Sequence, residues 1–171
     1  GEIFKMISKT PQITVSVVEG AAMAGAFGIA CASDLLVSMS HAKYALTETK
    51  IGLTPAQITP YVLNRLGFAN ARKMLLLGNI INGQEAYEMG MVDYLVNNES
   101  EINDIILKIK NQVQKCAPNA IAITKEILSN NNLVNPENAA ELFSSSIISE
   151  EGQEGLASFF EKRKPFWARE E

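Results

Sequence analysis

Three segments of the sequence carry residues whose types and spacing could do chemistry. In the first, a helix that starts near Ala24 would direct its free backbone N–H groups and its positive end at the terminus of the preceding strand. These donors suit a developing oxyanion, and glycine at Gly25 would let an acyl group approach the main chain. Tight packing of a helix on a sheet favours the same small residues, Ala24, Gly25 and Ala26, so the spacing alone is consistent with both interpretations.

The second segment carries Glu48, a lone carboxylate between the apolar residues Tyr44-Ala45-Leu46 and the residues Ile51-Gly52-Leu53. A carboxylate in such surroundings can serve as a general acid or base. The structural alternative is that Thr47 or Thr49 caps a short helix and that Glu48 is the favourable acid of its first turn.

The third segment, residues 159–165, contains two aromatic residues followed by three consecutive cations, Lys162, Arg163 and Lys164. Positive side chains near a helix end can hold phosphate groups, and aromatic side chains can lie against a ring system. Basic residues at the end of a helix also complement the helix dipole, so this segment has a structural explanation as well.

The elements that must position these residues begin with a β-helix-β order, which predicts a crossover between parallel strands. We expect a helix over 2–8, a strand over 13–18, a helix over 21–33 and a strand over 34–39. Residues 42–67 are punctuated by Gly and Pro and predict loops with short elements, where a site could be built.

The second half of the chain is predicted to be mainly helical. Helices over 69–77 and 83–89 should end at Gly78 and Gly90, and a short strand should follow over 92–96. From about residue 99 onward the pattern predicts helices, with starts at Pro118 and Pro136 and a turn at Asn130–Asn132.

Composition limits the classes of function. The chain has 171 residues, 47% hydrophobic and 20% charged, which excludes disorder and fibres. The net charge of −4, from 15 Lys and Arg against 19 Asp and Glu, gives no basic field, so we expect no nucleic-acid partner. The longest uncharged stretch that is rich in apolar residues, residues 20–33, has 14 residues and is too short to cross a bilayer, so we expect no membrane partner.

Histidine and cysteine are scarce. His41 is the one histidine, and Cys31 and Cys116 lie far apart in the sequence. This inventory is too small for a zinc site or for Ser-His or Cys-His catalysis, so we expect no metal. Two distant cysteines also favour a reducing compartment over a disulfide framework.

Taken together and in this order, the segments resemble the crotonase (enoyl-CoA hydratase/isomerase) superfamily. Residues 17–26 followed by residues 31–34 are similar to the family's Gly-x-Ala-x-Gly-Gly-Gly segment and its Cys-Asp or Ser-Asp strand entry. Residues 42–48 resemble its Ala-x-Phe-x-x-Pro-Glu segment, and residues 154–165 its closing Glu-Gly-x-x-Ala-Phe-x-Glu-Lys-Arg-x-Pro. Tight helix packing, helix capping and the complementing of a helix dipole would each explain one of these segments. They would not predict that all three occur together in this order.

The resemblance implies an α/β fold, with an N-terminally incomplete β-β-α spiral core in residues 1–115 and a C-terminal helical oligomerisation region in residues 116–171. It implies an acyl-CoA thioester as substrate, coenzyme A only as part of that substrate, and no other cofactor. It also implies a homotrimer or hexamer and a cytoplasmic location, or the mitochondrial matrix in a eukaryote.

Site residues follow from the same resemblance. Gly25 matches the glycine whose backbone N–H forms half of the oxyanion hole for the thioester carbonyl, and Glu48 matches one of the two glutamates that handle a water and the α-proton in enoyl-CoA hydratases. The residues expected to bind substrate or its CoA group are Ala24, Leu53, Phe159, Lys162 and Lys164.

Two departures from the family pattern bear on the reaction. Gly28 stands where hydratases carry the other glutamate, and residues 50–62 look most like the methylglutaconyl-CoA-type branch, which lacks that glutamate. The family's Ala-Gly-x-Asp-Leu segment, which gives the second oxyanion N–H, has no counterpart in these residues. We therefore expect a chain like the C-terminal two-thirds of a crotonase protein, which needs a complementary segment, chain or oligomer for activity.

The leading functional hypothesis is the hydration of an enoyl-CoA thioester by a lyase of fatty acid metabolism, through an enolate stabilised in an oxyanion hole. An isomerase or decarboxylase of the same fold stays open, because all of these reactions stabilise an enolate and Gly28 removes the second water-handling residue. A catalytically silent acyl-CoA-binding or assembly chain is the alternative from a different class. The resemblance does not specify the acyl chain.

Overall fold

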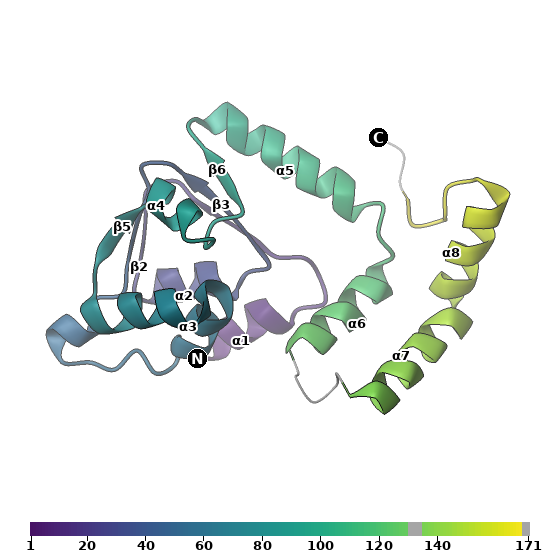
Figure 1. Ribbon diagram of the computed structural model, residues 1–171. Helices are drawn as coiled ribbons and strands as arrows, with labels where there is room; N and C mark the ends of the chain where they lie inside the picture. Colours follow the sequence, from purple (N-terminus) through teal and green to yellow (C-terminus); the bar gives the residue numbers. More distant parts are fainter. Residues whose placement is uncertain (130–134, 169–171) are drawn as a thin grey trace. The chain divides into compact units, whose positions relative to one another are not determined.

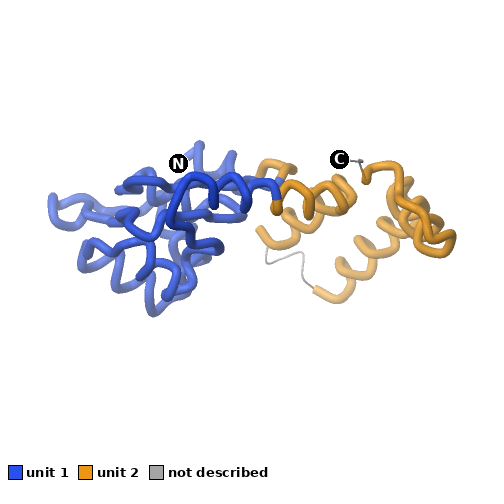
Figure 2. The backbone as a smooth tube through the Cα atoms, turned by 90° about the horizontal axis from the view of Figure 1, so that it is seen from above, with its two compact units in different colours: residues 1–8, 13–107 blue, residues 9–12, 108–171 orange. Residues whose placement is uncertain are grey.

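The computed structural model describes residues 1–129 and 135–168 (Figure 1). The turn that the sequence predicts at Asn130–Asn132 lies outside the described residues. The chain divides into two compact units, shown in different colours in Figure 2. The first contains residues 1–8 and 13–107, and the second contains residues 9–12 and 108–171.

A parallel sheet in the first unit has the strand order β1-β3-β6. Its strands are rich in apolar residues and are β1 (Val15–Val18), β3 (Leu35–Met39) and β6 (Tyr94–Val96). Val15 lies opposite Leu35, and β1 and β3 run parallel with the helix α2 (Gly25–Ala32) between them in the sequence. The predicted crossover is therefore confirmed.

A second sheet has the order β2-β4-β5 and consists of β2 (Ala21–Met23), β4 (Lys43–Ala45) and β5 (Ile80–Asn82). Strand β2 pairs in parallel with β4, and β5 pairs antiparallel to β4. The prediction of one helix over 21–33 is therefore wrong in its first residues, because hydrogen bonds to β4 hold Ala21–Met23 extended before α2 begins. The sequence also gave no sign of β5, which is only three residues long.

The helices of the first unit surround these sheets. They are α1 (Glu2–Lys9), α2, the 3-10 helix η1 (Glu48–Ile51), α3 (Thr59–Leu77) and α4 (Gly83–Glu88). Helix α3 is interrupted at Gly67, whose φ of 66° and ψ of 166° are not helical, and the part after this kink agrees with the helix predicted over 69–77. The part before it begins at Thr59, inside the region predicted to form loops, and Pro60 lies in its first turn, where no helical N–H is required. The predicted glycine ends are confirmed, since Gly78 and Gly90 have φ angles of 58° and 76° at the ends of α3 and α4.

The core of the first unit joins α2 to the second sheet. Phe27 packs edge to face against Tyr44, with ring centroids 6.1 Å apart, and both side chains are fully buried. The Tyr44 hydroxyl donates a 2.7 Å hydrogen bond to Ser38 Oγ, so neither buried hydroxyl lacks a partner. Ala30 and Ala32 on α2 are also buried, as the small-residue pattern predicts.

The second unit is helical and includes the end of α5 (Glu99–Val113), α6 (Pro118–Ser129), α7 (Pro136–Ile148) and α8 (Glu150–Glu161). Pro118 and Pro136 occupy first helical positions, as predicted. The side chains of Asn135 and Ser149 cap α7 and α8 by accepting backbone hydrogen bonds of 2.8 and 3.0 Å. Within residues 1–129 and 135–168, no helix combines the length and apolar character needed to cross a membrane.

Candidate active site

The parallel pairing of β2 and β4 brings two of the predicted site residues to one edge of a sheet. Met23 lies opposite Ala45, so the chain leaves both strands at the same end. The next residue after β2, Ala24, donates its backbone N–H to the carbonyl of Ala45 at 3.0 Å. Gly25 follows the end of β2, and Glu48 follows the end of β4. This carboxyl end of neighbouring parallel strands is a usual place for ligands in open α/β sheets.

A sharp turn at Ala24 directs the chain into α2. Ala24 has φ 47° and ψ −114°, a conformation that costs an alanine free energy and that glycine adopts readily. The N–H groups of the first turn have no helical acceptor, and this turn contains no acidic side chain that would occupy them. Gly25 is exposed, and a Cβ placed on it would have no atom within 4 Å. The start of α2 is therefore open to a negatively charged or polarised group.

Glu48 lies at the start of η1 and is half buried. Its Oε2 is buried without a hydrogen-bond partner among the described residues. A buried carboxylate oxygen is normally paired, so this one stands out as a position where a ligand can donate a proton or a hydrogen bond.

The structure contradicts the capping alternative for this segment. Thr47 is the N-cap residue of η1 but makes no side-chain capping hydrogen bond. The Thr49 hydroxyl is directed elsewhere and donates to the carbonyl of Leu76 at 3.4 Å. Capping by the threonine side chains is therefore wrong, whereas Glu48 is the acidic residue in the first turn of η1, as the same alternative predicts.

Leu53 lies in the turn that follows Glu48. Its backbone N–H donates to the carbonyl of Glu48 at 2.9 Å, and Gly52, with φ 76°, ends η1 between them. The Leu53 side chain is 58% exposed. The structure therefore brings Ala24, Gly25, Glu48 and Leu53 to one edge of the second sheet.

The position of the missing second glutamate is filled by apolar side chains. Gly28 is buried one turn into α2, and a Cβ placed on it would lie 2.6 Å from Ile58 Cγ2 and 2.9 Å from Phe4 Cε1. A longer side chain has no room there unless these residues move. Nothing in the sequence near Gly28 pointed to Phe4 or Ile58, because both are distant along the chain.

The predicted CoA-binding residues lie in the second unit. Phe159 is 77% exposed and packs edge to face with Phe160, with ring centroids 5.7 Å apart. Lys162 is the C-cap residue of α8, with φ 55°. Arg163 is held by Glu154, which accepts a 2.8 Å hydrogen bond from it, and this hydrogen bond lowers the pKa of Glu154.

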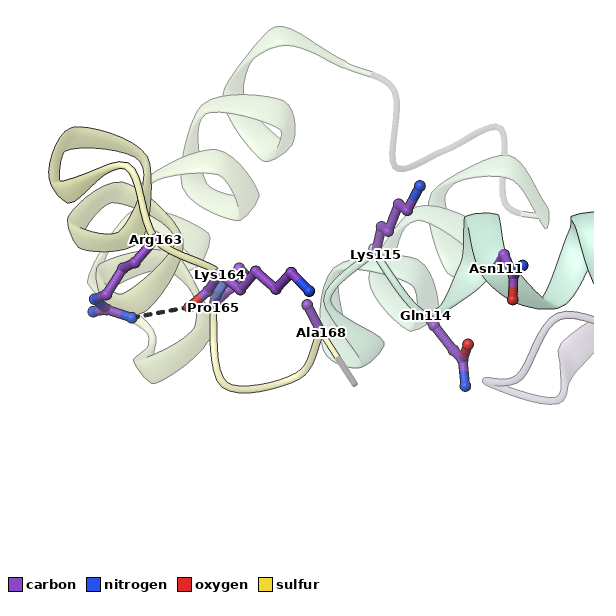
Figure 3. A pocket seen from close by; sticks show the side chains of 7 residues that line it. All are labelled: Asn111, Gln114, Lys115, Arg163, Lys164, Pro165 and Ala168. Carbon is purple, nitrogen blue, oxygen red and sulfur yellow. Dashed lines mark hydrogen bonds between the residues drawn. The ribbon is translucent and has the colours of Figure 1, made fainter. Parts of the chain in front are cut away.

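Lys164 lines a cavity of about 470 Å³ (Figure 3). In this view the Lys164 side chain extends toward the end of α5, whereas that of Arg163 extends the other way. The other lining residues are Asn111, Gln114, Lys115, Pro165 and Ala168. Lys115 is a further basic residue among those that line this cavity, and it could not be predicted from the sequence because it lies about fifty residues before Lys164.

Within residues 1–129 and 135–168, no group of three or more His, Cys, Asp or Glu side chains is arranged to hold a metal ion. Cys31 is buried and Cys116 is exposed, and both are free thiols. Burial raises the pKa of Cys31 to about 12, so this thiol is a poor nucleophile at neutral pH.

Comparison with known proteins gives a consistent result. The family model described as enoyl-CoA hydratase/isomerase matches residues 2–170. Methylmalonyl-CoA decarboxylase of Escherichia coli is 30% identical over 171 residues, which cover 96% of this chain and 65% of that protein. Carnitinyl-CoA dehydratase of Proteus mirabilis is 30% identical over 162 residues, which cover 90% of this chain and 62% of that protein. The chain thus spans less than two thirds of the length of these relatives.

Solved structures show the same extent of similarity. An enoyl-CoA hydratase/isomerase from Marinobacter aquaeolei superposes with a TM-score of 0.91 at 35% identity, over 98% of this chain and 65% of that chain. AtuE of Pseudomonas aeruginosa superposes with a TM-score of 0.93 at 34% identity, over 98% of this chain and 67% of that chain. The α/β fold is therefore that of these proteins.

Proposed function

Because the chain belongs to the enoyl-CoA hydratase/isomerase family, we propose that it acts on an acyl-CoA thioester and adds water across the double bond of an enoyl-CoA. The observation that carries this proposal is the buried, unpartnered Oε2 of Glu48, at the strand edge that also holds the start of α2. A carboxylate oxygen without a donor is available to exchange a proton with a substrate.

The thioester carbonyl oxygen would accept a hydrogen bond from the backbone N–H of Gly25. The positive end of α2 favours the negative charge that develops on this oxygen in an enolate, and no acidic residue in the first turn opposes it. The open space around Gly25 lets the acyl group approach the main chain. Ala24 and Leu53 would contact the substrate beside it.

Glu48 would move the proton. In hydration, the hydroxyl of water adds to the β-carbon of the enoyl group and a proton adds to the α-carbon. With one carboxylate at the site, Glu48 serves either the water or the α-carbon, and the remaining proton transfer needs a group from elsewhere. The half-buried position of Glu48 is suited to this role, because its carboxylate is partly shielded from water.

The second unit would bind the CoA part of the substrate. Lys162 and Lys164 supply positive charge for its phosphate groups, and the exposed Phe159 ring can lie against its adenine. Lys115 and Lys164 line one cavity, which supports a phosphate subsite there. No further cofactor is proposed.

Assembly and location are part of the same proposal. Exposed apolar side chains on α7 and α8, including Phe143, Ile148 and Phe160, support oligomerisation through residues 116–171 as a homotrimer or hexamer. We place the protein in the cytoplasm, or in the mitochondrial matrix of a eukaryote.

A specific observation favours a second reaction class, an isomerase or decarboxylase of the same fold. Phe4 and Ile58 fill the space beside Gly28, so a carboxylate side chain at this position would have to displace them. Isomerisation and decarboxylation need an oxyanion site and one proton-transfer group, which Gly25 and Glu48 would supply. The third possibility, a catalytically silent acyl-CoA-binding or assembly chain, would bind thioesters without turnover.

The test uses the protein expressed from its complete gene and a panel of 2-enoyl-CoA, 3-enoyl-CoA and malonyl-CoA-type thioesters. We expect loss of the conjugated enoyl-thioester absorbance with a 2-enoyl-CoA, and a decrease in kcat of about 10²-fold or more in Glu48→Gln. Glu88→Gln, at an exposed position on α4, is the matched control and should keep full activity. Unchanged turnover in Glu48→Gln contradicts the proposal, and binding without turnover by the unaltered protein favours the silent alternative.

A further inference from the structure

The C-terminal end of α3 contacts the segment that carries Glu48. The Thr49 hydroxyl, one residue after Glu48, donates to the carbonyl of Leu76 in the last turn of α3. Gly78, the C-cap residue of α3, approaches the carbonyl of Leu46, two residues before Glu48. The same helix end therefore lies beside the chain on both sides of Glu48, with a hydrogen bond at Thr49 and a close approach at Leu46.

Gly78 is required for this approach in two ways. Its φ of 58° lies in the left-handed region, which favours glycine. A Cβ placed on it would lie 3.1 Å from the Leu46 carbonyl oxygen and 2.9 Å from Lys50 Cε. The Lys50 side chain can move away, but Leu46 is buried and its carbonyl belongs to the main chain, so the main chain would have to shift by a few tenths of an ångström.

We propose that the end of α3 positions the Glu48 carboxylate, with Gly78 and Thr49 as positioning residues. The end of α3 adjoins the Glu48 segment at two points, through the hydrogen bond from Thr49 and through the close approach of Gly78 to the Leu46 carbonyl. Because Glu48 Oε2 has no hydrogen-bond partner among the described residues, the position of the carboxylate depends on the position of the main chain that carries it. This inference rests on the proposed role of Glu48 in proton transfer.

The experiment compares two glycines that share a left-handed conformation but differ in their surroundings. A Cβ on Gly78 meets Leu46, whereas a Cβ on Gly90, with φ 76°, meets nothing within 4 Å. Gly78→Ala should lower kcat on the order of fivefold with little change in KM. A displacement of a catalytic group by about 1 Å lowers the rate about 10²-fold, and the expected shift of the main chain is a few tenths of that distance. Gly90→Ala should keep the kcat of the unaltered protein. Equal kcat values in the two folded variants would overturn the proposal.

A second pair of variants covers the case in which Gly78→Ala does not fold. Thr49→Val removes the hydroxyl at nearly constant volume, and Thr49→Ser keeps it. We expect Thr49→Val to lower kcat about twofold to threefold, scaled from the same displacement argument, and Thr49→Ser to restore it. A kcat in Thr49→Val equal to that of Thr49→Ser would count against the role of this contact.

Glu48→Gln, measured beside these variants, distinguishes a failure of the positioning role from a failure of the proposed function. If Glu48→Gln loses turnover and neither Gly78→Ala nor Thr49→Val changes kcat, the positioning role is wrong and the proposed function stands. If Glu48→Gln keeps full turnover, the proposed function itself fails. A merely structural contribution of Gly78 would lower the unfolding temperature and leave kcat of the folded protein unchanged.

Discussion

The backbone N–H of Ala24 donates a 3.0 Å hydrogen bond to the carbonyl oxygen of Ala45. This bond extends the pairing of β2 with β4 beyond the last register pair, Met23 with Ala45, and into the turn that begins α2. The donors at the start of α2 and the carboxylate of Glu48 are thus fixed to the same two strands.

The first prediction concerns the strained turn at Ala24, whose φ is 47°. Ala24→Gly should raise the free energy of unfolding by about 0.5–1 kcal/mol, because a left-handed alanine costs about 1–2 kcal/mol and the added freedom of glycine in the unfolded chain offsets only part of this. Urea denaturation measures the difference. Ala26→Gly, the same substitution inside α2, should lower stability by about 0.5 kcal/mol. Changes of the same sign in both variants would contradict a strained turn at Ala24.

The second prediction concerns the close packing around Gly28. Gly28→Ala should destabilise the protein by about 1–2 kcal/mol, because its Cβ would lie 2.6 Å from Ile58 Cγ2. Gly20→Ala is the control and should be nearly neutral, since a Cβ there meets nothing within 4 Å. Thermal and urea unfolding of both variants provide the measurement.

A double-mutant cycle tests the same contact more directly. Ile58→Ala removes the methyl group that the new Cβ would meet, so the two substitutions together should cost at least about 1 kcal/mol less than the sum of their separate costs. Additive costs would show that Ile58 does not fill the space beside Gly28.

Much of the fold could be predicted from the sequence where local signals are strong. The β-branched run at Val15–Val18 predicted β1, and proline and glycine marked helix ends at Pro118 and Gly78. Strand β2 could not be predicted, because Ala21–Met23 has little intrinsic preference for an extended chain. Its conformation comes from hydrogen bonds to β4, more than twenty residues away, and such distant pairing has no local signature.

The candidate site could likewise be predicted only where the signal is local. Residue types and order pointed to Gly25 and Glu48, since donors at a helix start and a lone carboxylate are recognisable locally. The unpartnered Glu48 Oε2, and the filling of the Gly28 position by Phe4 and Ile58, depend on contacts between distant segments. The sequence already shows glycine at position 28, whereas these two features become visible only in the folded chain.

The third prediction concerns Arg65 on α3, which links α2 to β6. Its guanidinium donates to the carbonyl of Ser33 at 2.8 Å and to Asp93 at 3.2 Å, and its side chain is only 12% exposed. Arg65→Met should lower the free energy of unfolding by about 2–3 kcal/mol, because hydrogen bonds from a charged donor are worth about 1.5–3 kcal/mol and the Ser33 carbonyl would lose its donor. Arg72→Met, at an exposed position of the same helix, should change stability by less than about 0.5 kcal/mol in the same urea titration. Similar costs for the two variants would contradict a structural role for Arg65.

The fourth prediction is a loss of stability at alkaline pH that Cys31 causes. Burial raises the pKa of Cys31 from 9.0 to about 12 in the folded protein, so the folded chain keeps this proton over a range in which the unfolded chain releases it. Stability from this source is complete below about pH 9 and declines between about pH 9 and about pH 12, at about 1.4 kcal/mol per pH unit within that window. Tyr44, whose pKa burial also raises to about 12, adds a decline of the same sign above about pH 10.

Urea denaturation between about pH 8 and about pH 10 isolates the contribution of Cys31, since an unfolded tyrosine titrates only near pH 10. Cys31→Ala should flatten the decline in this interval, because alanine has no proton to release in the unfolded chain. Cys116→Ala removes an exposed thiol and should keep the slope of the unaltered protein. If the stability of Cys31→Ala and Cys116→Ala declines equally with pH, the buried thiol is not the group that links folding to alkaline pH.

A thiol reagent should likewise modify Cys116 in the folded protein well before Cys31, because the buried thiol is both inaccessible and protonated.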